Sequence, residues 1–265
     1  MQAPSIQIVS SNEAVVVTDV HIPCAAIGGM LWYRAIVPRV AAGERLPVLY
    51  LLHGGTSNPE EMQQDTNAVQ EAIAGRLIIV TPYAAYSWYT NAKHKPNERW
   101  EEAVSRDLIR DADSRFPTLA GREHRGLAGV SMGGYGATKL AIKHPELYGF
   151  AAMMGGSLDV TRRWPAIFNP GQSWDEWMIF GFRPSTRLDE DVYVLLPQMA
   201  NPQAVKWFAS CGTEDSTCEG DTEFVRQLRL RGVVAETSMT TGRHDWPTWS
   251  KSLPRMFLAA GEALR

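Results

Sequence analysis

The pentapeptide GVSMG, residues 129–133, constrains the fold of this chain more than any other feature. It follows a short apolar run, residues 125–130, and precedes a segment with helical spacing, residues 136–144. A G-x-S-x-G sequence between a strand and a helix is typical of a sharp turn that exposes the serine hydroxyl at one edge of a sheet. The flanking glycines let strand and helix approach each other without side-chain clashes. The motif therefore predicts a nucleophilic serine, Ser131, at the end of a buried strand.

The rest of the chain alternates between apolar runs typical of strands and segments typical of helices. The expected strands are residues 15–22, 31–37, 47–52, 77–81, 125–130, 149–154, 206–211 and 233–239. The expected helices are residues 99–116, 136–144 and 221–232, with a last one inside residues 246–260. Such alternation predicts a mostly parallel sheet with helices on both faces. Together with the serine turn, it predicts an α/β fold of the α/β-hydrolase type.

One segment, residues 157–201, breaks this alternation. It holds several Trp and Pro residues and shows little periodicity of either kind. We interpret it as a cap-like insertion above the sheet. A chain of 265 residues suits one large α/β domain or two small ones. Because we interpret residues 157–201 as an insertion, we expect a single domain over residues 1–265.

Composition argues against several classes of partner. The formal net charge of −3 does not provide the excess of positive charge that is typical of proteins that bind nucleic acid or an anionic membrane. The sequence has no run of 18 apolar residues, so no transmembrane helix is expected. Residues 1–10 lack the features of a signal peptide, which predicts a cytoplasmic protein as written. A secreted or periplasmic location stays open if a signal peptide was removed, and the oligomeric state is not indicated.

The three cysteines are Cys24, Cys211 and Cys218. An odd number at scattered spacing is not typical of a disulfide framework. Cys211 and Cys218 could bridge across a loop, but we favour two free thiols. Cysteine and histidine show no zinc-site spacing, so we expect no metal, and we expect no cofactor.

A serine hydroxyl becomes a strong nucleophile only beside a base that takes its proton. In α/β hydrolases the chain order is Ser, then Asp or Glu, then His. Two histidines follow the serine, and His144 lies too far along the following helix. His244, in a loop after the last expected strand, is the predicted base. Asp215, just after the preceding strand, is the predicted acid that orients the imidazole, with Glu214 as the neighbouring alternative.

The loop after the strand at residues 47–52 reads HGGT and is the predicted oxyanion loop. Backbone N–H groups of Gly55 or Thr56, together with that of Met132, would stabilise an oxyanion beside the serine. The sequence leaves open which of the two loop residues donates. We expect His53 to orient this loop through hydrogen bonds.

Aromatic residues gather in the insertion, in the loop after residues 77–81 and beside the predicted base. They are Trp88, Tyr89, Trp164, Trp174, Trp177 and Trp246. Ligand sites are often lined by such rings. We predict that Trp88, Tyr89, Trp177 and Trp246 line the substrate pocket, with packing in the core or in the insertion as the alternative for any one of the tryptophans. This pocket would favour a substrate with an aromatic or glycosyl part over a long fatty acyl chain.

The segments LLHGGTSN, SWYTN, GVSMGG, CGTED and HDWPTW resemble, in this order, the esterase D-like branch of α/β hydrolases, the "Putative esterase" family. The resemblance covers residues 31–249 and is closest to the tributyrin and feruloyl esterases. In these enzymes CGTED carries the acid and HDW the histidine, which supports Asp215 and His244. The resemblance implies a serine carboxylesterase for short-chain or aromatic esters, feruloyl or acetyl esters included, that can be linked to carbohydrate.

Two other activities would use the same residues. An acyltransferase would form the same acyl-enzyme, but it needs a site for an acceptor alcohol, which the sequence does not show. A thioesterase of the S-formylglutathione hydrolase kind usually carries a cysteine in the oxyanion loop, and residues 55–57 (GTS) have none. Loss of function on a hydrolase scaffold is disfavoured because the serine, acid and histidine are all present. The expected partner is a small-molecule or carbohydrate-linked ester, without nucleic acid or membrane.

Overall fold

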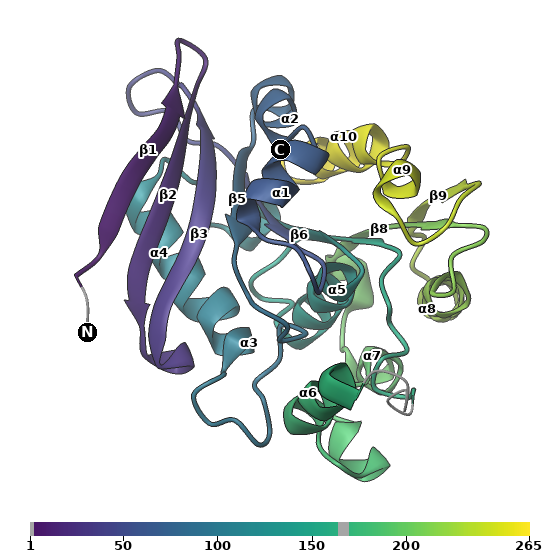
Figure 1. Cartoon of the computed structure of the whole chain (residues 1–265). Coiled ribbons are helices and arrows are strands. Elements are labelled where there is room, and N and C mark those ends of the chain that lie inside the picture. The colour runs from purple at the N-terminus through teal and green to yellow at the C-terminus, as the bar shows by residue number, and fades with distance from the viewer. Residues whose placement is uncertain (1–2, 164–169) are drawn as a thin grey trace.

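The computed structural model describes residues 3–163 and 170–265, and this part of the chain contains a nine-stranded sheet (Figure 1). Its strands are β1 (Ser5–Ser11), β2 (Val15–Cys24), β3 (Gly29–Pro38), β4 (Val48–Leu52), β5 (Ile78–Pro82), β6 (Arg125–Val130), β7 (Phe150–Met154), β8 (Lys206–Gly212) and β9 (Glu236–Thr240). Their order is β1-β2-β3-β5-β4-β6-β7-β8-β9. The pairs from β1 to β5 are antiparallel, and those from β5 through β4 to β9 are parallel. The predicted, mostly parallel sheet is confirmed.

Helices cover both faces of this sheet (Figure 1). They are α1 (Pro59–Asp65), α2 (Ala68–Gly75), α3 (Trp100–Glu102), α4 (Ile109–Arg115), α5 (Met132–Lys143), α6 (Pro170–Phe180), α7 (Val192–Leu195), α8 (Cys218–Leu230), α9 (Trp246–Trp249) and α10 (Leu253–Ala263). Side chains of α1, α2, α9 and α10 share one hydrophobic cluster, and those of α4, α5, α7 and α8 share the other. The α/β-hydrolase fold that the sequence predicts is confirmed.

The central strand β4 shows how the core is built. All five of its residues are buried, as expected of a strand covered on both faces. Tyr50 and Leu52 contribute to one cluster, whereas Leu49 and Leu51 contribute to the other. The alternation follows from the two-residue repeat of a strand. Side chains on the two faces of this apolar strand therefore pack against the two layers of helices.

Several elements differ from the sequence-based expectation. Strand β1 was not expected, because its residues are all exposed and it pairs only with β2 at the sheet edge. Helices α1 and α2 were also missed, since seven or eight residues give too short a periodic pattern. The helix expected at residues 99–116 consists of α3, a π-helical stretch at Ala103–Leu108, and α4.

The segment interpreted as an insertion contains short helices that weak periodicity did not reveal. In Figure 1, helices α6 and α7 lie below α5. The Tyr135 hydroxyl of α5 donates a hydrogen bond to the backbone oxygen of Glu190, 2.6 Å away. The segment is thus attached to the helix that follows Ser131. Within the described ranges, the helices are too short or too polar to span a bilayer.

Candidate active site

Ser131 lies in a tight turn between β6 and α5. Its backbone angles are φ 53° and ψ −119°, a conformation that L-residues rarely adopt. A Cβ atom on Gly129 would lie 2.4 Å from the carbonyl carbon of Gly133. A Cβ atom on Gly133 would lie 2.1 Å from the carbonyl oxygen of Leu52. Both glycines are therefore required for strand and helix to approach as the motif predicts.

The structure brings Ser131, His244 and Asp215 into one hydrogen-bonded chain. His244 Nε2 lies 2.8 Å from Ser131 Oγ, and His244 Nδ1 lies 2.9 Å from Asp215 Oδ2. The three residues follow β6, β9 and β8 respectively, so the parallel strands deliver them to the same edge of the sheet. The His244 side chain is 32% exposed, whereas that of Asp215 is fully buried. A substrate can therefore approach Ser131 and His244 from solvent, whereas solvent does not reach the Asp215 side chain.

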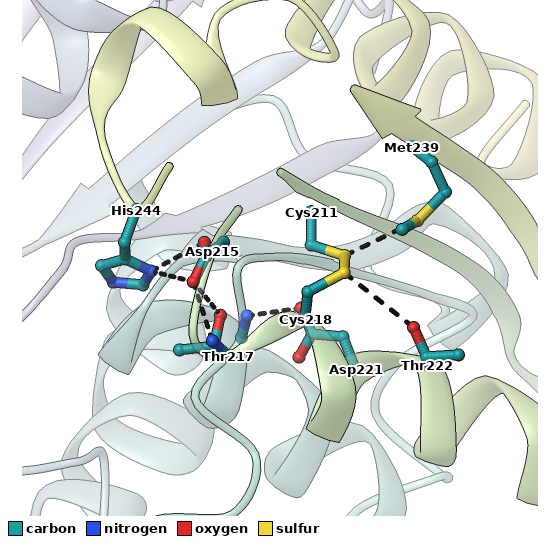
Figure 2. Close-up of a disulfide and its surroundings, with 9 residues drawn as sticks. Cys211, Asp215, Thr217, Cys218, Asp221, Thr222, Met239 and His244 are labelled. Carbon is teal, nitrogen blue, oxygen red and sulfur yellow. Dashed lines mark hydrogen bonds and ion pairs between the residues drawn. A yellow bond between two sulfur atoms is a disulfide. The ribbon is translucent and has the colours of Figure 1, made fainter. Parts of the chain in front are cut away.

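The surroundings of Asp215 fix its charge and its orientation (Figure 2). Oδ1 accepts hydrogen bonds from the backbone N–H and the hydroxyl of Thr217, both at 2.8 Å. Burial alone would raise the pKa of Asp215, but the hydrogen bonds from His244 and Thr217 outweigh it and hold the pKa below its usual value. An ionised Asp215 accepts the Nδ1–H of His244. The Nε2 atom of this tautomer is then the acceptor that faces the serine hydroxyl.

The carboxylates next to Asp215 and His244 in the sequence, and the second histidine after Ser131, have other partners. Glu214 is exposed and forms an ion pair with Arg243 at 3.4 Å. Asp245 caps the N-terminus of α9. His144 Nε2 lies 3.3 Å from a carboxylate oxygen of Glu101. None of these three side chains is paired with His244 or Ser131 in the described hydrogen bonds.

The HGGT loop after β4 lies beside Ser131. A Cβ atom on Gly54 would be 3.7 Å from the Cβ atom of Ser131. The buried His53 ring fixes the loop, because Nδ1 donates to the Gly54 oxygen at 2.6 Å and Nε2 accepts the N–H of Ala84 at 2.9 Å. Met132 opens α5, and the first N–H groups of a helix have no acceptor within it. Gly54 and the start of α5 thus flank the serine, and the oxyanion donors at Met132 and at Gly55 or Thr56 stay a prediction.

The four aromatic residues predicted to line the pocket fall into two groups. Tyr89 has no exposed surface, its hydroxyl donates to the His53 oxygen at 3.0 Å, and it is a core residue rather than a pocket residue. Trp88 belongs to the same buried group, with 5% of its surface exposed. Trp177 and Trp246 are partly exposed, so they remain candidates. Trp164 lies outside the described residues.

The expectation of free thiols at positions 211 and 218 is wrong. Cys211, near the end of β8, and Cys218, at the start of α8, form a disulfide (Figure 2). The turn between strand and helix brings their Cα atoms within 5.4 Å, which is a normal spacing for a disulfide. Cys24 is a buried free thiol.

Sequence reasoning missed two residues that touch the hydrogen-bonded chain. Trp249 packs its ring edge-to-face against His244, with centroids 4.9 Å apart. Gly155, just after β7, has φ +55°, and a Cβ atom there would lie 2.8 Å from Asp215 Oδ2. A glycine directly after a buried strand was the available signal for the second residue. Trp249 gave no signal in the sequence, because a tryptophan is as typical of core packing as of an active site.

The fold and this serine–histidine–aspartate arrangement define an α/β hydrolase with a serine nucleophile elbow. Residues 26–260 match the model of the family described as "Putative esterase". The chain belongs to this family.

Relatives and solved structures agree with this assignment. The chain is 27% identical over 226 residues to a Mycobacterium tuberculosis protein named as an esterase, a match that covers 77% of this chain and 49% of that protein. It therefore spans about half the length of that relative. It is 25% identical to an acetyl esterase of Caldicellulosiruptor saccharolyticus, over 81% of this chain and 83% of that enzyme. The solved fluorophosphonate-binding serine hydrolase F of Staphylococcus aureus superposes with a TM-score of 0.82 at 20% identity, covering 94% of this chain and 99% of that one, and shows the same fold.

Proposed function

We propose that this chain is a serine carboxylesterase that works through an acyl-enzyme. The single observation that supports this proposal best is the hydrogen-bonded chain from Ser131 Oγ to His244 Nε2 and from His244 Nδ1 to Asp215. This is the geometry that a general base needs to activate a serine hydroxyl. Membership of the esterase family supports the same reading.

In the proposed first half-reaction, Ser131 Oγ attacks the ester carbonyl carbon while His244 Nε2 takes its proton. The carbonyl oxygen becomes an oxyanion, which accepts hydrogen bonds from the backbone N–H of Met132 and from that of Gly55 or Thr56. Asp215 holds the imidazole and stabilises the imidazolium. His244 then gives its proton to the leaving alcohol, and the acyl group stays on the serine.

The second half-reaction repeats these steps with water. His244 takes a proton from the water molecule, whose oxygen attacks the acyl carbon. The tetrahedral intermediate collapses, the carboxylic acid leaves, and Ser131 Oγ regains its proton from His244. The 32% exposure of the histidine side chain is consistent with water access to this step.

The proposed substrates are short-chain or aromatic esters, acetyl and feruloyl esters included, some of them linked to carbohydrate. The relative named as an acetyl esterase supports the short acyl group. Trp246 is partly exposed and lies two positions after His244, where it could stack against an aromatic or glycosyl part of the substrate. Trp177 in the 157–201 segment is the second candidate for this contact.

Replacement of Ser131 by alanine tests the proposed activity. Ser131→Ala should abolish hydrolysis of p-nitrophenyl acetate and leave the circular dichroism spectrum unchanged, because alanine keeps the Cβ atom and removes only the hydroxyl group. Retained hydrolysis would overturn the assignment. A panel of p-nitrophenyl acetate, butyrate and octanoate, methyl ferulate and acetylated xylan then measures the acyl and alcohol preference. Trp246→Ala should lower kcat/KM for methyl ferulate more than for p-nitrophenyl acetate.

A further inference from the structure

The disulfide closes the loop that carries Asp215. Cys211 and Cys218 are seven positions apart, and the residues between them include Asp215 and Thr217 (Figure 2). Cys211 is part of β8, whose register against β7 and β9 is fixed by parallel pairing. Cys218 begins α8. The covalent bond therefore joins the strand before the acid to the helix after it.

Within the loop that the disulfide closes, hydrogen bonds hold both the backbone and the side chain of Asp215. The N–H of Asp215 donates to the Gly212 oxygen at 3.0 Å, and the N–H of Cys218 donates to the Asp215 oxygen at 3.1 Å. With the two hydrogen bonds from Thr217 to Oδ1, the backbone and the carboxylate of Asp215 are both held. These bonds all lie between the two ends that the disulfide fixes. A change in the distance between the ends would therefore move the carboxylate.

The beginning of α8 has a second anchor on the other side. Asp221, one turn after Cys218, accepts a hydrogen bond from the N–H of Gly156 through Oδ2 at 2.8 Å. Gly156 follows Gly155, whose backbone lies against Asp215 and His244. The first turn of α8 is thus tied to β8 by a covalent bond and to the end of β7 by a hydrogen bond. A dithiol can break the covalent tie by thiol–disulfide exchange, a reaction that does not involve the groups of the hydrogen bond.

We propose that the Cys211–Cys218 disulfide is a positioning element for Asp215, which makes turnover faster in the oxidised chain than in the reduced chain. The inference rests on the proposed esterase activity. Without the bond, the ends of the loop separate and the carboxylate no longer holds His244 in line with Ser131. Effects of about a hundredfold from small misplacements of catalytic groups are known. The disulfide does not touch the serine or the oxyanion loop, so its loss acts through the acid.

The bond is open to chemical reduction. Cys211 is buried, but Cys218 is partly exposed. A dithiol such as dithiothreitol attacks as a thiolate at one sulfur, giving a mixed disulfide, and its second thiolate then releases the protein thiol. The disulfide gains two electrons and two protons, and the dithiol becomes a cyclic disulfide. The product chain has free thiols at both positions.

The test compares kcat and KM for p-nitrophenyl acetate at 25 °C in the oxidised chain, the reduced chain and Cys211→Ser/Cys218→Ser. Thiol titration verifies each state, and thermal unfolding verifies that each is folded. We expect kcat to fall about tenfold in both altered forms while KM stays within about twofold. Reoxidation should restore the activity of the reduced chain. Cys24→Ser, which keeps the disulfide, should show the same dependence of kcat and KM on reduction and reoxidation as the wild type.

Removal of Asp215 provides the decisive comparison. In an Asp215→Asn background, loss of the disulfide should lower kcat by less than about twofold, because the group that the bond positions is already disabled. Equal kcat in the oxidised and reduced wild type would overturn the inference, and so would a full tenfold loss in the Asp215→Asn background. If Cys211→Ser/Cys218→Ser does not fold, the reduced chain gives the same comparison. Hydrolysis by the oxidised wild type, absent in Ser131→Ala, tests the esterase activity separately from the disulfide.

Discussion

Lys139 Nζ lies 2.8 Å from Glu190 Oε2, and both side chains are almost completely removed from solvent. The ammonium group also donates to the backbone oxygen of Tyr89 at 2.8 Å and lies 3.0 Å from a carboxylate oxygen of Glu101. Lys139 belongs to α5, the helix that begins directly after Ser131. This buried group of charges therefore joins the helix of the nucleophile to the 157–201 segment and to the loop before α3.

Removal of the lysine charge should destabilise the fold strongly. Lys139→Met leaves the two buried carboxylates of Glu101 and Glu190 with one lysine, Lys143, between them, and loss of one partner of a buried ion pair costs about 3–5 kcal/mol. The free energy of unfolding in urea measures it. Lys93→Met is the matched control, because Lys93 pairs with a largely exposed Asp189 and should contribute less than about 1 kcal/mol. Equal losses in both variants would contradict this prediction.

Gly155 is expected to tolerate no side chain. A Cβ atom would lie 2.8 Å from Asp215 Oδ2 and 2.8 Å from Trp249 Nε1, on a backbone with φ +55°. Gly155→Ala should therefore push the carboxylate away from His244 and lower kcat/KM for p-nitrophenyl acetate at least tenfold, on the order of what small misplacements produce. Gly261→Ala, where a Cβ atom meets nothing within 4 Å, should leave kcat/KM unchanged. Full activity in Gly155→Ala would show that this contact does not position the acid.

The two neighbouring carboxylates should differ sharply in their effect on rate. Asp215→Asn removes the charge that holds the Nδ1–H of His244, so kcat should fall by about three to four orders of magnitude. Glu214→Gln should change kcat little, because that side chain is exposed and pairs only with Arg243 in the described contacts. Steady-state kinetics on p-nitrophenyl acetate decide between them. A large loss in Glu214→Gln with a small loss in Asp215→Asn would move the acid to position 214.

His53 should make stability depend on pH. Burial lowers the pKa of His53 from 6.5 to about 4, although the hydrogen bond to the Gly54 oxygen opposes this shift. Protonation of Nε2 would also remove the acceptor of the Ala84 N–H. Between these two values the unfolded chain binds a proton that the folded chain does not. The free energy of unfolding therefore falls as pH is lowered through this window, by roughly 3 kcal/mol in total.

Urea unfolding at pH 7 and at pH 4.5 measures this dependence. Other groups with lowered pKa values, such as Asp215, also contribute to the loss at low pH. The contribution of the ring is the difference between wild type and His53→Gln, which should lose less stability on acidification. The same loss in both proteins would show that His53 does not stay neutral in the fold.

Much of the architecture was predictable from local sequence. The buried strands appear as continuous apolar runs, because both faces of a parallel strand are covered, and β4 is an example. The turn at Ser131 was predictable because its strand, glycines and helix are contiguous in the chain. Asp215 and His244 were found through their chain order and their places after strands, and the structure brings both to the serine. The exposed β1 and the short α1 and α2 carried too weak a periodicity to be seen.

The sequence by itself determined the α/β class, the serine turn and the identity of the three residues that meet at the edge of the sheet. Only the tertiary structure decided that Cys211 and Cys218 are bridged, that Tyr89 is buried beneath the HGGT loop, and that Lys139 pairs with Glu190. The physical reason is the range of the interactions. Strand, turn and helix preferences act over a few consecutive residues, whereas pairing and burial depend on which distant segments fold against one another.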